Sequence, residues 1–287
     1  MPSLKAIKRR INSVDTTKKI MKAMDMVAAA KLQKVKARLD AARAYAAEAG
    51  KILAALHGCD EAMESPFFSQ RKEKSAVYVV ISSDRGLCGS HNANLTQSAV
   101  AHMNKSKGEG KREQIIAVGQ KGYEYFTARG GAILRTFPDV AETVLYADAV
   151  RVAEYVNGLY AAGEADEVYV AYTRFESALS HVPQVVRILP ISAREGEEAA
   201  KGRKAVYDPD VHSFLEHAAP AFLNAFFYAA LVESSASEQA ARMLSMESAV
   251  NNATEIIGKL TRSYNRRRQA AITQEISEIV TSASIMK

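Results

Sequence analysis

Apolar residues near the start of the chain recur at alternating steps of three and four from Leu4 to Leu56. Only Lys18 and Asp25 interrupt this seam, and Gly and Pro are absent over most of its length. A 3.5-residue period kept this long predicts a coiled-coil helix of about 80 Å, starting at Pro2-Ser3 and ending near His57-Gly58. The seam consists of Leu4, Ile7, Ile11, Val14, Met21, Ala28, Leu32, Val35, Leu39, Ala42, Ala46, Ala49, Leu53 and Leu56.

The C-terminal part of the chain carries a second seam of the same kind, with Gln239 as its single polar member. Its apolar members are Phe222, Ala225, Ala229, Val232, Ala236, Met243, Met246, Val250, Ala253, Ile257, Leu260 and Tyr264. Two long seams in one chain can cover each other, so we predict that the two helices pair as an antiparallel coiled coil.

The second seam is interrupted by the polar cluster Arg266–Gln269 and then resumes, shifted by one residue. The shifted positions are Ile272, Ile276, Ile279, Ala283 and Met286. A shift of this kind alters the supercoil locally, and we expect it to mark where the C-terminal helix continues beyond its partner. Nothing else in the chain remains to cover this apolar tip.

The middle of the chain changes period. Short β-branched runs bounded by Gly, Pro or charge predict buried strands, and the stretches between them predict helices. The predicted strands are Ala76–Ile81, Gln114–Val118, Glu167–Tyr172 and Pro183–Leu189. The predicted helices are Asn92–Met103, Lys121–Arg129 and Val144–Ala161, with a loop at Asn104–Arg112.

Strands and helices that alternate in this way are typical of an open, largely parallel sheet. We therefore predict an α/β chain with a central Rossmann-like α/β domain at 75–207. An N-terminal coiled-coil helix at 1–58 and a C-terminal coiled-coil helix at 209–287 flank this domain and pair with each other.

Composition excludes several classes of protein. The longest nearly apolar stretch, Ala221–Val232, is shorter than the ~20 residues of a membrane span, and the charged N-terminus lacks the apolar region of a signal peptide. We expect a chain that neither spans a membrane nor is secreted. Cys59 and Cys88 fit no metal spacing, so we interpret them as small buried residues in a reducing compartment.

Positive charge is concentrated near the N-terminus. Twelve basic and three acidic residues lie between Lys5 and Arg43, a net charge of +9, whereas the whole chain carries +6. A helix with one strongly basic face favours an acidic partner, which could be a protein, a lipid surface or a nucleic acid.

The sharpest local motif is Ser82–Gly89, which lies between the first predicted strand and a helix. An α/β sheet can bind phosphate at such a turn, but the glycines do not match G-x-G-x-x-G and no G-K-[ST] follows. We favour a tight turn in which Asp84 and Arg85 form a local or inter-element ion pair. The six histidines form no H-E-x-x-H pair, and we expect no catalytic residue, cofactor or metal.

Three motifs together carry a resemblance to a known family. Lys18–Lys31, Ser82–Gly89 and Glu233–Met243, in this order, resemble the γ subunit of bacterial F-type ATP synthase, and Ile272–Glu278 also resembles the family signature. Ser282 stands where the family commonly has Gly. The resemblance spans both helices and the central domain.

The resemblance implies a non-catalytic rotor shaft that couples proton-driven rotation of the c-ring to the catalytic β subunits and regulates ATPase activity and proton flow. The implied partners are the α3β3 ring, the ε subunit and the c-ring, without nucleic acid. The implied location is peripheral, at the cytoplasmic face of the bacterial inner membrane.

The resemblance also assigns site residues. It implies contacts with an acidic lever on β for Lys22, Met24 and Lys31, and contacts with β catch loops for Arg242, Arg268, Gln269 and Thr273. It implies a bearing tip and a base facing the c-ring or ε. The tip residues are Ile276, Ile279, Ala283 and Met286, and the base residues are Tyr207 and Asp208.

Two other classes of function remain open from the residues alone. A nucleotide-dependent α/β enzyme with helical arms would bind ATP as an isolated chain. A nucleic-acid or membrane-surface protein using the basic helix would bind with steep salt dependence. Neither explains two matched seams around one sheet domain together with a bare apolar tip.

Overall fold

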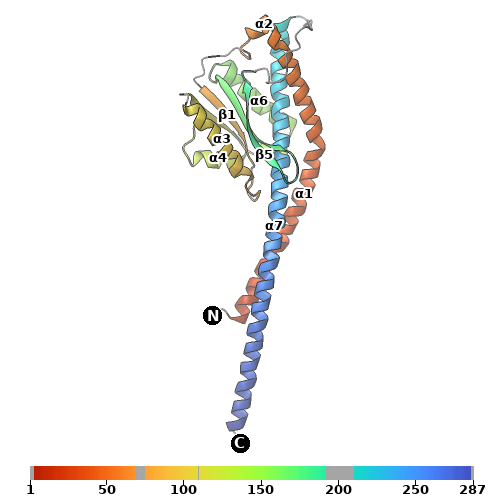
Figure 1. Cartoon of the computed structure of the whole chain (residues 1–287), viewed down its shortest axis with the longest axis vertical. Coiled ribbons are helices and arrows are strands. Elements are labelled where there is room, and N and C mark those ends of the chain that lie inside the picture. The colour runs from red at the N-terminus through yellow and green to blue at the C-terminus, as the bar shows by residue number, and fades with distance from the viewer. Residues whose placement is uncertain (1–2, 69–70, 72–74, 109, 192–209, 286–287) are drawn as a thin grey trace. The chain divides into compact units, whose positions relative to one another are not determined.

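The structure, a computed structural model, describes residues 3–68, 71, 75–108, 110–191 and 210–285 (Figure 1). The chain divides into two compact units, one formed by 1–28 and 243–287 and the other by 29–242. The elements are α1 Leu4–Ala54, a 3₁₀ helix Ala55–Gly58, α2 Asp60–Met63, β1 Ser75–Ile81, α3 His91–Gly108, β2 Arg112–Val118, α4 Gln120–Thr127, β3 Ile133–Phe137, α5 Val140–Thr143, α6 Tyr146–Ala161, β4 Glu167–Phe175, β5 His181–Leu189 and α7 Val211–Ile285. Helices α1 and α7 contribute residues to both units.

The predicted seams of α1 and α7 face the interior of each unit. In the unit formed by 1–28 and 243–287, Ile7 is 5% and Ala253 4% exposed. Every seam position of α1 and, up to Tyr264, of α7 is buried or half-buried, including the polar Lys18 and Asp25. Two long helices packed together were predicted from the seams, and this prediction is confirmed.

Polar side chains cap the starts of both long helices. The Ser3 hydroxyl accepts a hydrogen bond from the Ala6 amide at 3.3 Å. The Asp210 carboxylate accepts one from the Ser213 amide at 2.8 Å. Each cap satisfies an amide that has no partner within its own helix.

The central domain is built on a five-stranded sheet in the order β3-β2-β1-β4-β5. Strands β3, β2, β1 and β4 are parallel, whereas β5 runs antiparallel to β4. In the middle of the sheet Val79 of β1 pairs with Ile116 of β2 and Val170 of β4. The predicted open, largely parallel sheet is therefore confirmed.

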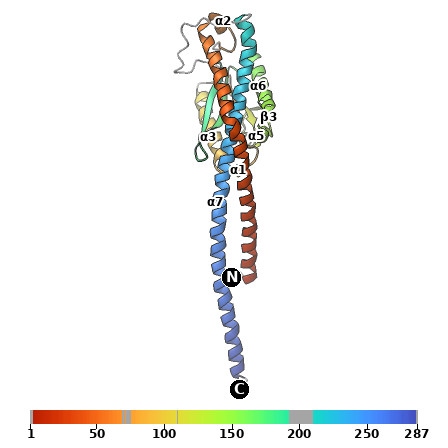
Figure 2. The same cartoon turned by 90° about the vertical axis from the view of Figure 1, so that its right-hand side faces the viewer.

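Helices cover both faces of this sheet. On one face Tyr78 and Val80 form a buried cluster with Leu95 of α3 and Phe126 of α4. On the other face α6 packs through an edge contact between Tyr155 and Phe137, and α7 through one between Phe226 and Tyr172. Figure 2 shows α3 and α6 on opposite sides of the sheet.

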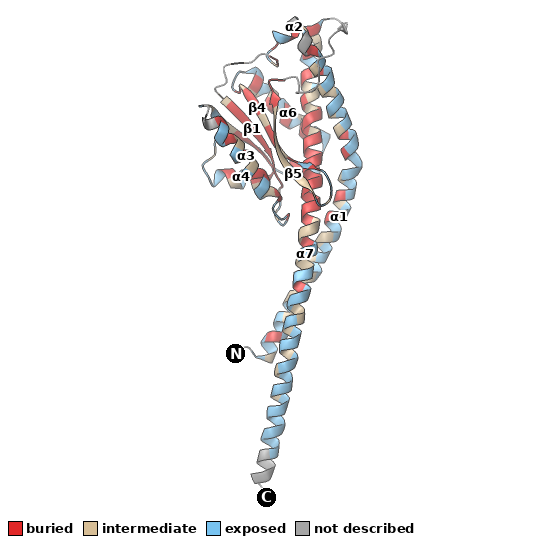
Figure 3. Ribbon diagram, viewed as in Figure 1, coloured by how far each residue is buried: buried red, intermediate tan, exposed pale blue. Residues whose placement is uncertain are grey.

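The sheet and α1 surround the middle of α7. Leu223, Phe227 and Leu231 are at most 1% exposed, and this part of α7 is the most continuously buried helix segment in Figure 3. By length and composition alone α7 contains a window that could cross a membrane, with a mean hydropathy of 1.2, and 56% of this window is buried within the protein. The burial is typical of a core helix.

The structure corrects several local predictions. The loop predicted at Asn104–Arg112 is wrong for most of its length, because α3 continues to Gly108 and β2 begins at Arg112. Strand β3 and the short helices α2 and α5 were not predicted. Strand β3 lies at the sheet edge with Arg135 and Thr136 exposed, so its sequence lacks the apolar run of a central strand. The division of the chain into an N-terminal helix at 1–58, a central domain at 75–207 and a C-terminal helix at 209–287 stays a prediction.

Candidate functional site

Residues 229–242 of α7 are buried on every side of the helix. This segment nevertheless carries seven polar residues, which sit against the sheet, α1 and the turn that follows β1. They are Glu233, Ser234, Ser235, Ser237, Glu238, Gln239 and Arg242, and each is at most 9% exposed. We call this set the buried polar segment of α7. Buried polar groups need partners, so each contact of this segment constrains the fold.

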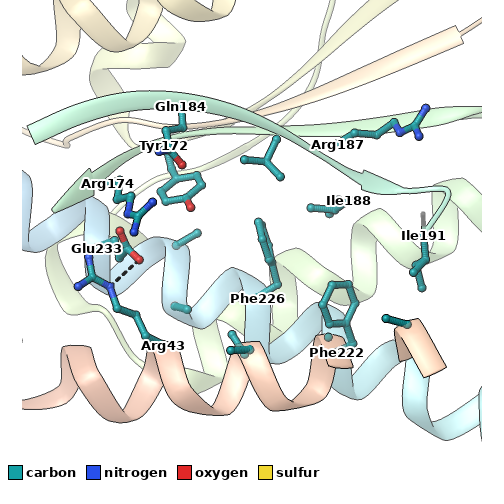
Figure 4. Close-up of a pocket in the computed structure, with 17 residues that line it drawn as sticks. Arg43, Tyr172, Arg174, Gln184, Arg187, Ile188, Ile191, Phe222, Phe226 and Glu233 are labelled. Carbon is teal, nitrogen blue, oxygen red and sulfur yellow. Dashed lines mark hydrogen bonds and ion pairs between the residues drawn. The ribbon is translucent and has the colours of Figure 1, made fainter. Parts of the chain in front are cut away.

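Glu233 joins three elements. Its carboxylate accepts hydrogen bonds from Arg43 Nε of α1 at 2.9 Å and from the Phe175 amide at the end of β4 at 3.2 Å. Arg43 also donates to the Phe175 carbonyl. Figure 4 shows the Arg43 and Glu233 side chains pointing toward each other between the helices. The hydrogen bond and charge of Glu233 raise the pKa of Arg43 above its usual value.

Two serine hydroxyls fasten α7 to strands of the sheet. Ser234 donates to the carbonyl of Ile81, the last residue of β1, at 3.1 Å. One turn later Ser237 donates to the Thr173 carbonyl of β4, also at 3.1 Å. Both carbonyls lie near the carboxyl ends of parallel strands.

Glu238 and Arg242 fasten α7 to the Ser82–Gly89 turn. Arg242 Nη1 lies 2.6 Å from Glu238 Oε1, and Nη2 donates to the carbonyls of Arg85 and Gly86 at 3.3 and 3.2 Å. Burial raises the pKa of Glu238, although Arg242 opposes this effect. A guanidinium suits this position because its rigid fork of donors reaches a carboxylate and two carbonyls at once.

The turn itself is held by Asp84. Its carboxylate accepts hydrogen bonds from the amides of Gln120, Asp139 and Glu142, each at 3.1 Å. Burial raises the pKa of Asp84 despite these donors. Amides at the starts of helices are the groups that would hold a phosphate, and here the protein's own carboxylate uses them. The turn therefore has a structural role. The expected pairing of Asp84 with Arg85 is corrected, because Asp84 binds backbone amides and Arg85 pairs with Glu142 at 3.1 Å.

A cavity of about 530 Å³ lies beside the Glu233 contacts, between α1, α7 and strands β4 and β5. In Figure 4 Arg43, Arg174 and Glu233 lie at one end of it, and Phe222 and Ile191 lie at the other. The wall on the side of α1 consists largely of small residues, Ala46, Ala47, Gly50 and Ala54. Apolar packing between α1 and the sheet is consequently thin here.

The chain matches known proteins along almost its whole length. A family model described as ATP synthase covers residues 3–286. The ATP synthase gamma chain of Geobacter sp. (strain M21) is 40% identical over 288 residues, and that of Heliobacterium modesticaldum is 40% identical over 293 residues. Each alignment spans 100% of both chains. This chain belongs to the ATP synthase gamma chain family.

Solved structures agree with this family. A chain of the central stalk and c-ring structure of Tetrahymena thermophila mitochondrial ATP synthase is 28% identical, with a TM-score of 0.62, covering 80% of this chain and 99% of that one. A chain from Euglena gracilis mitochondrial ATP synthase in rotational state 3 has a TM-score of 0.67 at 20% identity, covering 99% and 94%, and supports the fold. Gamma chains are non-catalytic subunits of their complex.

The residues predicted to meet the β lever lie on α1 of this gamma chain. Lys22 is exposed and Met24 is half-buried. Lys31 pairs with Glu142 at 3.1 Å, and the hydrogen bond from Lys31 is the main cause that lowers the pKa of Glu142. The Glu142 carboxylate thus binds Lys31 with one oxygen and Arg85 with the other.

The residues predicted to meet β catch loops differ in exposure. Arg268, Gln269 and Thr273 are exposed on α7. Arg242 is only 9% exposed and is engaged by Glu238 and the turn. A catch-loop contact of Arg242 stays a prediction, and it would require the guanidinium to leave these partners.

The apolar tip is bare where the structure describes it. Ile276 is 55% and Ile279 68% exposed, together with Ile272 and Val280. Ala283 lies in α7, but its side chain is outside the described part. The remaining predicted residues, Met286, Tyr207 and Asp208, lie outside the described residues altogether.

Sequence reasoning missed the contacts of Glu233, Ser234, Ser237 and Glu238. One signal was available, because residues 229–241 contain no Lys or Arg. An exposed helix surface normally mixes both signs of charge in i,i+4 pairs. A helical run of Ser, Ala and Glu without basic residues therefore indicates polar groups whose partners lie elsewhere.

Among the described residues, no group of three His, Cys, Asp or Glu could hold a metal ion.

Proposed function

We propose that this gamma chain is the central rotor shaft of an F1Fo ATP synthase. In this function the central domain turns with the c-ring, and the two long helices turn inside the α3β3 ring. Rotation then drives the catalytic β subunits through states of different nucleotide affinity, so that mechanical work shifts conformational populations. The chain would also regulate ATPase activity and proton flow, because both depend on rotation.

The observation that carries this proposal is the far end of α7. Its isoleucines at 272, 276 and 279 are 47% to 68% exposed, although the helix continues without interruption to Ile285. An exposed apolar helix end indicates a surface that a partner covers. A sleeve of other subunits around the helix end fits this requirement, and a smooth apolar contact allows rotation because it has no preferred direction.

The polar groups near this end fit contacts with the ring. Arg268, Gln269 and Thr273 are exposed and offer donors to catch loops of β. On α1, Lys22, Met24 and Lys31 belong to the basic stretch, which favours the acidic lever of β. Tyr207 and Asp208 complete the proposal as the part of the base that faces the c-ring or ε.

The proposal places the chain at the membrane only through Fo. It is a peripheral subunit at the cytoplasmic face of the bacterial inner membrane, with the ε subunit bound to the central domain. This arrangement accounts for the net charge of +9 in the N-terminal stretch without a lipid or nucleic-acid ligand.

Purification and rotation measurements test the proposal. A tagged chain extracted from membranes in mild detergent is expected to bring α, β, ε and c subunits with it. A bead attached to the central domain of the immobilised complex is expected to turn during ATP hydrolysis. Absence of α and β from the purified material, or a stationary bead on an actively hydrolysing complex, would contradict the proposal.

A further inference from the structure

The contacts of Glu233 form a closed ring across three elements. Glu233 of α7 binds both Arg43 of α1 and the Phe175 amide of β4, and Arg43 also binds the Phe175 carbonyl. Each of the three residues is therefore bonded to the other two, and Figure 4 shows the contact between Arg43 and Glu233. The Glu233 side chain is 9% exposed and that of Arg43 34%, so solvent screens this ion pair less than a surface pair.

The surroundings of this ring make it mechanically important. The adjacent cavity of about 530 Å³ separates α1 from strands β4 and β5, and its wall on α1 is made of small side chains. Apolar contact resists sliding poorly because it is non-directional, whereas a charge-assisted hydrogen bond has a preferred geometry. Directional bonds are consequently most needed where packing is thinnest.

The other polar contacts described above join only one of the two long helices to the central domain. Ser234 and Ser237 connect α7 with strands of the sheet, and Arg242 connects α7 with a turn. Lys31 connects α1 with Glu142, but these two side chains are 44% and 34% exposed. Exposed pairs contribute little because water and salt screen them. Glu233 instead connects α1, α7 and the sheet through one carboxylate.

We infer that Glu233 is the positioning residue through which torque passes between the central domain and both shaft helices, with Arg43 and the Phe175 backbone as its partners. This inference rests on the proposed rotor function. A twist applied to the sheet reaches α7 and α1 together through this carboxylate. Without it, α1 can slide along the cavity while α7 remains held by its serine contacts.

The test measures torsional stiffness in the intact complex. A bead is attached to the central domain through Glu124→Cys, an exposed position on α4, in a Cys59→Ser background, and the shaft is stalled in α3β3 by a non-hydrolysable nucleotide. Because charge-assisted hydrogen bonds are roughly twice as strong as neutral ones, Glu233→Gln is expected to widen the angular fluctuation of the bead, with its variance rising up to about twofold. Glu233→Ala should widen it further.

Two further variants separate a mechanical role from general destabilisation. Arg43→Lys keeps the charge but loses the fork that reaches both Glu233 and Phe175, so an intermediate width is expected. Glu48→Gln on α1 removes the same charge from a side chain that is 66% exposed and should leave the width unchanged. Proton pumping per ATP hydrolysed is expected to fall in the same order as the width rises.

Each outcome has a distinct meaning. If the bead on the parent complex does not turn with ATP, the rotor function itself fails. If it turns, and the Glu233 variants assemble and keep the parent width, the inference about Glu233 is wrong. A lower melting temperature without a wider fluctuation would give Glu233 a purely structural role and would also overturn the inference.

Discussion

Lys111 Nζ lies 2.7 Å from Glu167 Oε2, and the two side chains are 6% and 2% exposed. Glu167 also lies 3.4 Å from Arg187 Nη1 and accepts a hydrogen bond from the Tyr169 hydroxyl at 3.2 Å. Burial is the main cause that raises the pKa of Tyr169. This cluster holds the start of β4 to the residue before β2 and the strand β5.

Removal of Lys111 is expected to be costly. Lys111→Met leaves the buried Glu167 carboxylate with a weaker set of partners, and breaking a buried pair in this way costs about 3–5 kcal/mol. Urea unfolding of the purified chain measures the loss. The control is Lys259→Met, because Lys259 and Glu255 are 63% and 62% exposed and such pairs contribute about 0–1 kcal/mol. Equal losses in the two variants would contradict the prediction.

The buried His91 is expected to make stability depend on pH. Burial, aided by the nearby His181 and Arg242, lowers the pKa of His91 from 6.5 to about 4. Between these values the unfolded chain binds the proton and the folded chain does not, so stability rises with pH and is lost as pH falls from 6.5 to 4. The contribution is at most about 3 kcal/mol.

Substitution of His91 tests this pH dependence. In His91→Phe the free energy of unfolding should change less between pH 6.5 and 4 than in the parent chain. His212→Gln, at a side chain that is 79% exposed, should keep the slope of the parent. Denaturant titrations at several pH values give both slopes, and an unchanged slope in His91→Phe would refute the assignment.

Gly119 is expected to tolerate no side chain. Its φ is +90°, and a Cβ would lie 2.2 Å from the Ser82 carbonyl oxygen. Gly119→Ala must therefore move the end of β2 away from the turn, at a cost of at least about 3 kcal/mol. Gly158→Ala on α6 meets no atom within 4 Å and should stabilise the chain by about 0.5–1 kcal/mol. Thermal unfolding distinguishes the two, and similar melting temperatures would show that the close approach is absent.

Arg242 is expected to control access to the turn. Arg242→Lys loses the fork that binds Glu238 and two carbonyls, which should loosen the turn by about 1–2 kcal/mol and raise thiol labelling of the buried Cys88 roughly tenfold. Labelling is followed in a Cys59→Ser background. Arg268→Lys, at an exposed position of α7, should not change the rate. A rate equal to that of the parent in Arg242→Lys would mean that the turn is held by Asp84 alone.

Met24→Lys is expected to impair coupling more than assembly. It adds a positive charge between Lys22 and Lys31, which strengthens the contact with an acidic lever and delays its release. Proton pumping per ATP hydrolysed in membrane vesicles measures the effect. Ala23→Lys adds the same charge to the neighbouring exposed position and should have a smaller effect. Parent coupling in assembled Met24→Lys complexes would remove Met24 from the proposed lever contact.

The sequence by itself determined the long helices and the central strands, because both depend on local periodicity. The 3.5-residue seams of α1 and α7 identified the inward positions, and the shift at Arg266–Gln269 indicated where α7 becomes bare. The β-branched runs located β1, β2, β4 and β5. Edge strand β3 was not predicted, because two of its five residues are exposed and its sequence therefore has no continuous apolar run.

Only the tertiary structure decided which polar residues are buried and what they hold together. Glu233 is 190 residues away from Arg43 in the chain and 58 from Phe175, so no local pattern can predict their ring of contacts. The Asp84 carboxylate likewise accepts hydrogen bonds from backbone amides that lie 36, 55 and 58 residues away in the chain. Periodicity indicates which side of an element faces the core. The partner of a buried charge depends instead on which elements, distant in the sequence, the fold brings side by side.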